Sequence, residues 1–198
     1  MKIYGDIKSG NCYKISLLCA LLGIEHEWIH VDILQGETQC DSFLTLNPNG
    51  KIPLLVCDDG QCLSESNAII NYLASGSSLY GSDPFTQAKI QQWQFFEQYS
   101  HEPYIAVARY IAKYLGLPKE REAEYHAKQG GGHKALRVME QQLSQTPYLA
   151  GEKLSTADIS LYGYTHVAHE GGFDLSDYPH IKQWIKRVQA QPGYVGMA

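Results

Sequence analysis

The chain has 198 residues, of which 44% are hydrophobic and 19% are charged, and its formal net charge at pH 7 is −5. This length allows one domain or two small ones, each with a buried core. The acidic balance argues against nucleic acid and anionic membranes as partners. No apolar run reaches the ~20 residues of a membrane span, and Met1 does not open a signal sequence, so we expect a cytoplasmic protein.

The cysteines and histidines do not have the spacing of a disulfide framework, a redox dithiol or a metal site. The five cysteines are an odd number and contain no CxxC pair, which argues against both a disulfide framework and a redox dithiol. The eight histidines lack the additional spaced ligands of a zinc site. We therefore expect no metal.

Residues 1–75 alternate short apolar runs with helical patterns. Four runs are typical of strands, and two segments show the i, i+3, i+4 spacing of a helix. The strands are expected at 2–5, 27–33, 51–56 and 61–63; the helices are expected from Asn11 to Leu22 and from Ser64 or Glu65 onward, the latter with Ala68, Ile69, Tyr72 and Leu73 on its apolar face. The order β-α-β followed by β-β-α predicts a mixed four-stranded sheet with helices on both faces.

The rest of the chain has a helical pattern. A Gly- and Ser-rich linker at 76–84 precedes an all-helical domain at 85–198, with helices expected near 85–114, 119–145, 155–170 and 178–190. Pro103 should kink the first of these helices. Ser155 and Asp158 have the spacing of a capping box, in which each side chain satisfies a backbone N–H of the other.

Three consecutive glycines, Gly130–Gly132, lie inside the second long helical pattern. Each costs ~1 kcal/mol relative to alanine in a helix. Two interpretations stay open. The triplet either allows a bend or a close approach to the backbone, or it breaks the segment into two shorter helices.

Three segments of the first domain suit a common ligand. Ser9 begins a helix, whose positive end stabilises a thiolate. If the Ile52–Pro53 bond is cis, the backbone of Ile52 can pair with a peptide. Glu65 and Ser66 begin another helix, where unpaired N–H groups favour a carboxylate. A small acidic peptide that carries a thiol fits all three.

Four motifs, taken in order, give the chain its family likeness: YGDIKSGNCYK (4–14), NPNGKIP (47–53), LSESNAI (63–69) and LSTADISL (154–161). The chain resembles a cytosolic glutathione transferase of bacterial type over essentially its whole length. The resemblance implies a thioredoxin-like first domain, a helical second domain and a homodimer. It also implies glutathione as co-substrate, with no further cofactor, and attack of its thiolate on a small hydrophobic electrophile.

The resemblance offers three candidates beside the glutathione sulfur. In classes similar to theta and delta, a serine in this loop donates to the sulfur, and Ser9 occupies that place. In another bacterial group with a Thr-Pro-Asn-Gly-x-Lys loop the asparagine does so, and Asn11 and Lys14 match that pattern. A cysteine nucleophile would be Cys12. We rank Ser9 before Asn11 and Asn11 before Cys12, which we expect to be a packed small hydrophobe.

The same resemblance implies the rest of the glutathione site. Ile52, before a cis Pro53, should pair with the cysteinyl backbone. Glu65 should meet the γ-glutamyl amine and Ser66 its carboxylate. Lys51, with Gln39 or Thr38, should meet the glycyl carboxylate.

The electrophile pocket is expected beside the first long helix, with Tyr104, Ala108, Arg109 and Tyr110 as lining residues. Such a tyrosine pattern also suits a helical core, and Arg109 could either attract an anionic electrophile or bridge helices. Neither the electrophile nor the pathway follows from the sequence. Two other functions stay open: a glutathione-dependent disulfide or peroxide reductase, and a binding module of this fold without catalysis.

Overall fold

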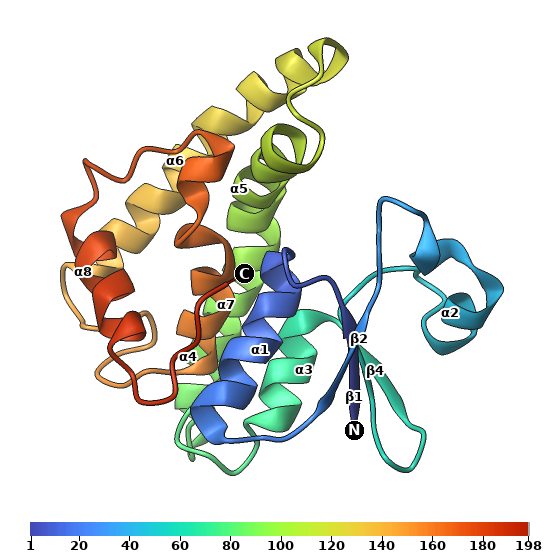
Figure 1. Ribbon diagram of the computed structural model, residues 1–198. Coiled ribbons are helices and arrows are strands. Elements are labelled where there is room, and N and C mark those ends of the chain that lie inside the picture. Colours follow the sequence, from blue (N-terminus) through green and yellow to red (C-terminus); the bar gives the residue numbers. More distant parts are fainter. Residues whose placement is uncertain (198) are drawn as a thin grey trace. The chain divides into compact units, whose positions relative to one another are not determined.

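The computed structural model describes residues 1–197 (Figure 1). The chain forms two compact units. One comprises Met1–Ser75 and the segment from Gln191 onward, and the other comprises Gly76–Ala190. All of residues 85–198 were expected to belong to the helical domain, whereas the segment after Ala190 belongs to the first unit.

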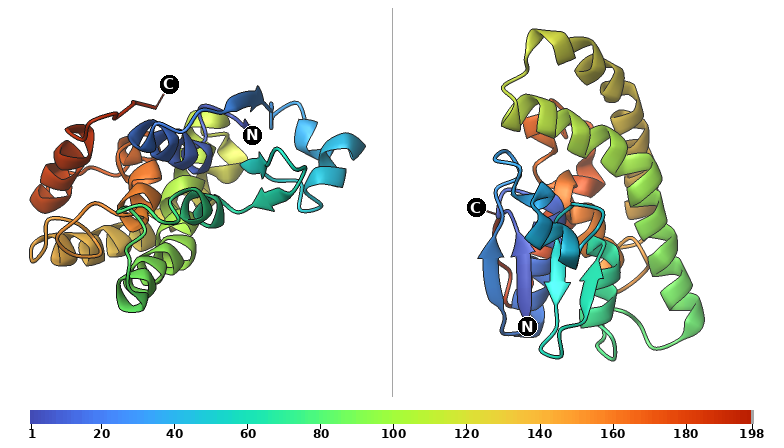
Figure 2. Two further views of the ribbon diagram at one scale, coloured as in Figure 1. Left: turned by 90° about the horizontal axis from the view of Figure 1, so that it is seen from below. Right: turned by 90° about the vertical axis from the view of Figure 1, so that its right-hand side faces the viewer.

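The first unit contains the expected mixed four-stranded sheet, with strand order β2-β1-β3-β4 (Figure 2, right). β1 (Lys2–Gly5) and β2 (Glu27–His30) are parallel, and β3 (Leu54–Val56) is antiparallel to both β1 and β4 (Cys62–Ser64). β3 is shorter than predicted because Pro53, which has no N–H to donate, precedes its first residue. β2 ends at His30 instead of residue 33.

Helices cover both faces of this sheet, with α1 (Gly10–Leu22) and α3 (Ser66–Leu73) on one face and α2 (Asp41–Leu46) on the other (Figure 1). Alternate side chains of a strand point to opposite faces. Leu54 accordingly packs with Phe43 of α2, whereas its neighbour Leu55 is fully buried on the opposite side. α1 ends at Gly23, which has φ 64° and ψ 34°, the left-handed cap expected there.

The buried face of α3 differs from the one predicted. The helix buries Ser66, Ile69 and Ile70, whereas Ala68 is exposed and Tyr72 is 56% exposed. Ile69 is buried as predicted, but the rest of the face is shifted because the first turn of α3, where polar Ser66 lies, contacts α1. Hydrophobic periodicity does not detect a buried serine.

The segment after Ala190 lies against α1. The hydroxyl of Tyr13 donates a hydrogen bond to the carbonyl of Val195, with 2.7 Å between the two oxygens. Gly193 has φ +81°, and a Cβ there would lie 2.8 Å from the carbonyl oxygen of Ala20. This close approach requires glycine.

The described part of the second unit contains helices joined by turns and loops, with an isolated bridge between Tyr148 and Gly151. It contains α4 (Pro84–Phe96), α5 (Glu102–Arg109), α6 (Glu122–Leu143), α7 (Thr156–Thr165) and α8 (Pro179–Gln189). A π-helical turn, Glu97–His101, joins α4 to α5, and a second one, Tyr110–Tyr114, follows α5. The first turn ends two residues before Pro103, close to the predicted kink.

Every residue of α7 is buried, and its start is the predicted capping box. The carboxylate of Asp158 accepts hydrogen bonds from the backbone N–H groups of Leu149 and Ser155, the Ser155 hydroxyl and the indole N–H of Trp184, at 2.9 Å each. One buried side chain thus ties the start of α7 to the preceding loop and to α8.

The glycine triplet lies within an unbroken α6, so the interpretation as a break between two helices is wrong, and the alternative of a close approach to the backbone is correct. A Cβ on Gly131 would overlap the ring of Tyr104, and one on Gly132 would overlap the ring of Phe173. A Cβ on Gly130 would meet nothing within 4 Å. Two of the three glycines therefore admit an aromatic ring against the helix backbone.

All five cysteines are free thiols, in agreement with the expected absence of a disulfide framework. Among the helices that the structure describes, none is both long and apolar enough to cross a membrane.

Candidate active site

Three predicted segments meet at one edge of the sheet. Tyr4 of β1 pairs with Leu54, the first residue of β3, and Leu54 pairs with Ser64, the last residue of β4. The loop to α1 leaves β1 at this edge, residues 52–53 enter β3 there, and residues 65–66 leave β4 there. The strand register therefore gathers the predicted thiol, backbone and carboxylate sites.

Ser9 is the N-cap of α1. Its φ of −79° and ψ of 126° are extended, and its Oγ accepts from the backbone N–H of Cys12 at 3.5 Å. This contact uses a lone pair of the hydroxyl, so the proton can still be donated to a ligand. The positive end of the helix dipole favours a negative charge at the same place. Ser9 thus has the chemistry to stabilise a thiolate.

Cys12 points away from solvent and is 0% exposed. A Cβ on Gly5 would lie 2.9 Å from its sulfur and 3.0 Å from the ring of Trp28, so the thiol is packed between the strands and α1. Burial raises the pKa of Cys12 to about 12, although the hydrogen bond with Ser9 works in the opposite direction. A thiol that keeps its proton at neutral pH is a poor nucleophile.

Asn11 lies in a polar network that connects the first turns of α1 and α3. The Ser66 hydroxyl donates to Asn11 Oδ1 at 3.1 Å, and the ammonium group of Lys14 donates to Ser66 Oγ at 3.4 Å. Ser66 is 4% exposed and Lys14 is 0% exposed. In the sequence, Lys14 stood out only because it matches the lysine of the Thr-Pro-Asn-Gly-x-Lys loop. Nothing in the sequence indicated that its side chain is buried.

Glu65 has an unusual backbone conformation, with φ 69° and ψ 113°, immediately before α3. For a residue other than glycine this region costs on the order of 1–3 kcal/mol, and such residues concentrate at functional sites. The side chain of Glu65 is exposed, and Ser66 begins the helix beside it. Glu65 was predicted as a site residue, but its strained backbone has no signal in the sequence.

A hydrogen bond to the carbonyl of Gly50 joins Gln39 to the turn that precedes Lys51. The Gln39 amide donates to the carbonyl of Gly50 at 3.0 Å, and the Asn47 side chain donates to the carbonyl of Lys51 at 2.7 Å. These bonds fix the turn that leads into Ile52–Pro53, whose peptide bond is cis as predicted. Lys51 is exposed, whereas the Gln39 amide is already engaged with this turn and with Thr38 Oγ1.

The four residues predicted for the electrophile pocket differ in exposure. Tyr104 packs its ring on Gly131, and the ring of Tyr110 contacts that of Tyr114, with 5.4 Å between ring centroids and a tilt of 33° between the ring planes. Both tyrosines are half-buried. Ala108 is fully buried among the helices, so its side chain cannot line an open pocket.

Arg109 bridges helical segments, which was the second of its two expected roles. It is 4% exposed, its Nε lies 2.6 Å from Glu170 Oε2, and Lys113 binds the other carboxylate oxygen at 2.9 Å. Burial opposes ionisation of Glu170, but the two cations outweigh it and lower the pKa of that carboxyl. The arginine charge is therefore compensated within the helical unit.

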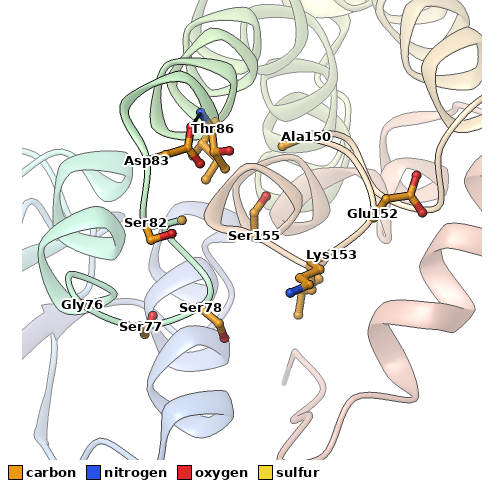
Figure 3. A pocket seen from close by; sticks show the side chains of 13 residues that line it. Gly76, Ser77, Ser78, Ser82, Asp83, Thr86, Ala150, Glu152, Lys153 and Ser155 are labelled. Carbon is orange, nitrogen blue, oxygen red and sulfur yellow. Dashed lines mark hydrogen bonds between the residues drawn. The ribbon is translucent and has the colours of Figure 1, made fainter.

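The helical unit also contains a cavity of about 540 Å³, between the segment around Gly76–Ile90 and the loop before α7 (Figure 3). Its polar side chains include Asp83, which caps α4 by accepting from the N–H groups of Phe85 and Thr86, and Ser155 of the capping box. None of the residues predicted for catalysis or binding lines this cavity.

The chain matches two protein-family models. Residues 9–75 match the glutathione S-transferase N-terminal domain, and residues 93–192 match the glutathione S-transferase C-terminal domain. The crystal structure of a glutathione S-transferase from Pseudomonas fluorescens Pf-5 is 62% identical, with a TM-score of 0.98, and the alignment covers 99% of this chain and 98% of that one.

Two more distant relatives extend the comparison. Glutathione S-transferase 3 of Zea mays is 32% identical over 98% of this chain and 91% of its own length. A maleylacetoacetate isomerase from Methylobacterium extorquens AM1, solved with bound malonate and glutathione, is 26% identical with a TM-score of 0.81, and covers 98% of this chain and 94% of its own. With both of its domains matched in order, this chain belongs to the glutathione S-transferase family.

Proposed function

We propose that this glutathione transferase binds glutathione at the sheet edge and activates its thiol chiefly through Ser9, as in the serine classes similar to theta and delta, with Asn11 as an auxiliary donor. The observation that supports Ser9 most is its position as N-cap of α1, where its hydroxyl lies at the positive end of the helix dipole. The burial of Cys12 speaks against a cysteine nucleophile.

The carboxylate groups of glutathione fit the remaining residues. The first turn of α3, with Ser66 beside buried Lys14, suits the γ-glutamyl carboxylate, and the exposed Glu65 carboxylate suits the amine. Ile52 is proposed to pair with the cysteinyl backbone and Lys51 to meet the glycyl carboxylate. The maleylacetoacetate isomerase that contains glutathione is a relative with the same fold, which supports glutathione as the ligand here.

The first experiment separates the catalytic proposal from its alternatives. Wild-type protein is passed over immobilised glutathione and then assayed with a chlorinated nitrobenzene, a peroxide and a glutathione mixed disulfide. Retention with conjugation supports the transferase. Turnover of only the disulfide or the peroxide would indicate a reductase, and retention without any turnover would indicate a binding module.

Variants of Ser9 then test the thiol site. Ser9→Ala removes both cap and hydroxyl, Ser9→Gly keeps most of the capping free energy and removes the hydroxyl, and Ser9→Thr keeps both. Loss of one donor to an anion costs roughly 10²-fold in a closed site, equivalent to about 2.7 kcal/mol, and less in an open cleft. We expect conjugation at pH 7 to fall 10- to 100-fold in Ser9→Ala and Ser9→Gly alike.

The pH dependence of conjugation in the Ser9 variants is a second test of the thiol site. Losing the donor raises the pKa of the bound thiol, so activity should recover as the pH is raised, while the dissociation constant of glutathione stays within a few-fold. Cys12→Ser should keep most of the conjugating activity. If Cys12→Ser is inactive and the wild type carries a glutathione mixed disulfide on Cys12, Ser9 is not the catalytic residue.

We also propose a homodimer, on the basis of the exposed face of α4 and the turn after it. Phe85, Phe95 and Tyr99 are 76%, 63% and 82% exposed. Their spacing brings them to one side of a helical segment, and an exposed aromatic row of this kind favours association with a second copy. Light scattering should give the dimer mass for the wild type and a monomer for Phe95→Glu. Ala123→Glu, which adds the same charge to the exposed surface of α6, should remain dimeric.

A further inference from the structure

The cavity beside the linker has the volume of a ligand site and contains none of the residues proposed for conjugation. It measures about 540 Å³, and small-molecule pockets typically measure roughly 300–1,000 Å³. One wall is the linker with the start of α4, and the other is the loop before α7 (Figure 3). All of its lining residues belong to the helical unit, Gly76–Ala190. The cavity can therefore be analysed within that unit alone.

Hydrogen bonds join the two walls of this cavity. The backbone N–H of Thr156, the first residue of α7, donates to the carbonyl of Leu79 in the linker at 2.8 Å. The side chain of Gln94 in α4 donates to the Thr156 hydroxyl at 3.3 Å, and that of Gln87 donates to the carbonyl of Gly81 at 3.2 Å. The walls are thus fixed relative to each other, and a ligand that enters requires little reordering of the chain.

The two helices that begin at the cavity do not themselves offer an anion site. Asp83 Oδ1 accepts from the first backbone N–H groups of α4, those of Phe85 and Thr86, at 3.1 and 2.9 Å. At the start of α7, the carboxylate of Asp158 accepts from the N–H of Ser155 at 2.9 Å. A carboxylate of the chain already occupies the positive end of each helix dipole. The chemistry of the cavity therefore comes from its side chains.

Two of these side chains present acceptors. Hydrogen bonds from the side chain and backbone of Thr86 lower the pKa of the Asp83 carboxyl, so this group is charged at neutral pH. Ser155 is 5% exposed, its hydroxyl proton goes to the Asp158 carboxylate, and its oxygen accepts from one backbone N–H. A hydroxyl oxygen has two lone pairs, so one of them remains for a ligand. A carboxylate and a hydroxyl lone pair together suit an ammonium group.

Other side chains present donors. In the view of Figure 3, Lys153 extends from the loop before α7 toward the linker wall, whereas the carboxylate of Glu152 points away from it. The linker wall carries the exposed hydroxyls of Ser78 and Ser82. An ammonium group and hydroxyl protons suit a carboxylate. The cavity thus offers partners for both charges of a zwitterion.

The apolar part of the lining favours an alkyl chain between these charges. Ile90 of α4 is 0% exposed, and Ala150 and Leu154 of the opposite wall are half-buried. No aromatic side chain lines the cavity, so it lacks the flat surface on which a planar ring would stack. A short branched alkyl group suits this lining best.

We propose that the cavity is a second ligand site, which binds a small α-amino acid with an apolar side chain as its zwitterion. The ammonium group of the ligand binds at Asp83 and Ser155, its carboxylate binds at Lys153, and its side chain packs on Ile90 and Leu154. This site takes no part in the conjugation reaction, and its occupant is bound together with glutathione.

The test is made with the glutathione site filled, because the γ-glutamyl end of glutathione is itself an α-amino acid. Wild-type protein saturated with S-methylglutathione is titrated with leucine in a calorimeter. Two analogues are titrated in parallel: 4-methylpentanoate, which is leucine without the ammonium group, and 3-methylbutylamine, which is leucine without the carboxylate. We expect leucine to bind, and each analogue to bind about 10-fold more weakly, the scale of one charge-assisted hydrogen bond at a partly exposed site.

Two variants assign the charges to the cavity. Asp83→Asn keeps a residue that caps helices equally well and removes the negative charge. It should weaken leucine about 10-fold and leave 4-methylpentanoate within about twofold of wild type. Lys153→Gln should weaken leucine to the same extent and leave 3-methylbutylamine unchanged. The control is Lys134→Gln, which removes the same charge from the exposed surface of α6, outside the cavity, and should bind leucine as wild type does.

Unchanged affinity for S-methylglutathione shows that the variants are folded. The proposal is wrong if leucine does not bind to the saturated wild type, if leucine and S-methylglutathione displace each other, or if both analogues bind as tightly as leucine. Equal leucine affinity in Asp83→Asn, Lys153→Gln and wild type would also refute it. If S-methylglutathione does not bind to the wild type, the proposed function fails instead, and the same variants titrated with leucine alone still decide the present proposal.

Discussion

Three consecutive glycines in α6 allow a stability comparison in which only the surroundings of the added methyl group change. Alanine is favoured over glycine inside a helix by about 1 kcal/mol. At Gly130 a Cβ would meet nothing within 4 Å, so Gly130→Ala should raise the free energy of unfolding by about 0.5–1 kcal/mol.

The same gain applies at Gly132, but there the new methyl group would overlap the ring of Phe173. Phe173 is 0% exposed and cannot swing into solvent. Inserting a methyl group into a packed core costs typically about 1–3 kcal/mol, and the overlap places this position at the upper end. Gly132→Ala should therefore lower the free energy of unfolding by about 1–2 kcal/mol in net terms.

Gly131 should give a value between these two. Its methyl group would overlap the ring of Tyr104, which is only half-buried and can move outward. Urea unfolding followed by circular dichroism would measure the three variants against wild type. If Gly132→Ala proved as stable as Gly130→Ala, the close packing of Phe173 on α6 would be refuted, and with it our explanation of the triplet.

Three further predictions concern other parts of the molecule. Asp158→Ala strands four buried donors and should destabilise the chain by more than about 3 kcal/mol. Ser155→Ala removes the cap and one of those four donors but leaves the carboxylate with its other three, and should cost about 1–2 kcal/mol; similar urea midpoints for the two variants would contradict this. Burial lowers the pKa of His166 to about 4, despite its hydrogen bond to the carbonyl of Tyr162, so the unfolded chain takes up the proton first as the pH falls. The free energy of unfolding should then drop by up to about 3 kcal/mol between pH 6.5 and pH 4, and His166→Phe should lack that part of the slope. Tyr13→Phe should cost about 1 kcal/mol and speed amide exchange in residues 191–197, and unchanged exchange there would show that the hydrogen bond to Val195 does not hold the segment.

The sequence predicted the features that local chemistry decides. Period-2 and period-3.6 patterns located the four strands and the helices. Caps at Ser9, Gly23 and Ser155 are local signals too, since each depends on residues within one turn. The rotation of α3 could not be predicted, because its first turn buries a serine against a partner 55 positions away in the chain.

The candidate site likewise combines features that local sequence patterns predict with features that depend on residues far apart in the chain. A serine before a helix, a proline at a strand start and a polar pair before another helix are local patterns, and the strand register brings them to one edge. The sequence could not decide between the two roles of Arg109, because its partner Glu170 is 61 residues distant. The burial of Lys14 likewise follows from the packing of α3, and no pattern around residue 14 reports it.

The position of the segment after Ala190 has a consequence for the order in which the chain folds during synthesis. Tyr13 is made early, but its partner Val195 is 182 residues away and emerges from the ribosome only after the whole helical unit. The helical unit, Gly76–Ala190, is continuous in the chain and can fold as soon as it emerges. The unit that begins first is thus completed after the helical unit. A nascent chain that has emerged only as far as Ala190 would contain a whole helical unit and an α1 whose Tyr13 hydroxyl still lacks the Val195 carbonyl.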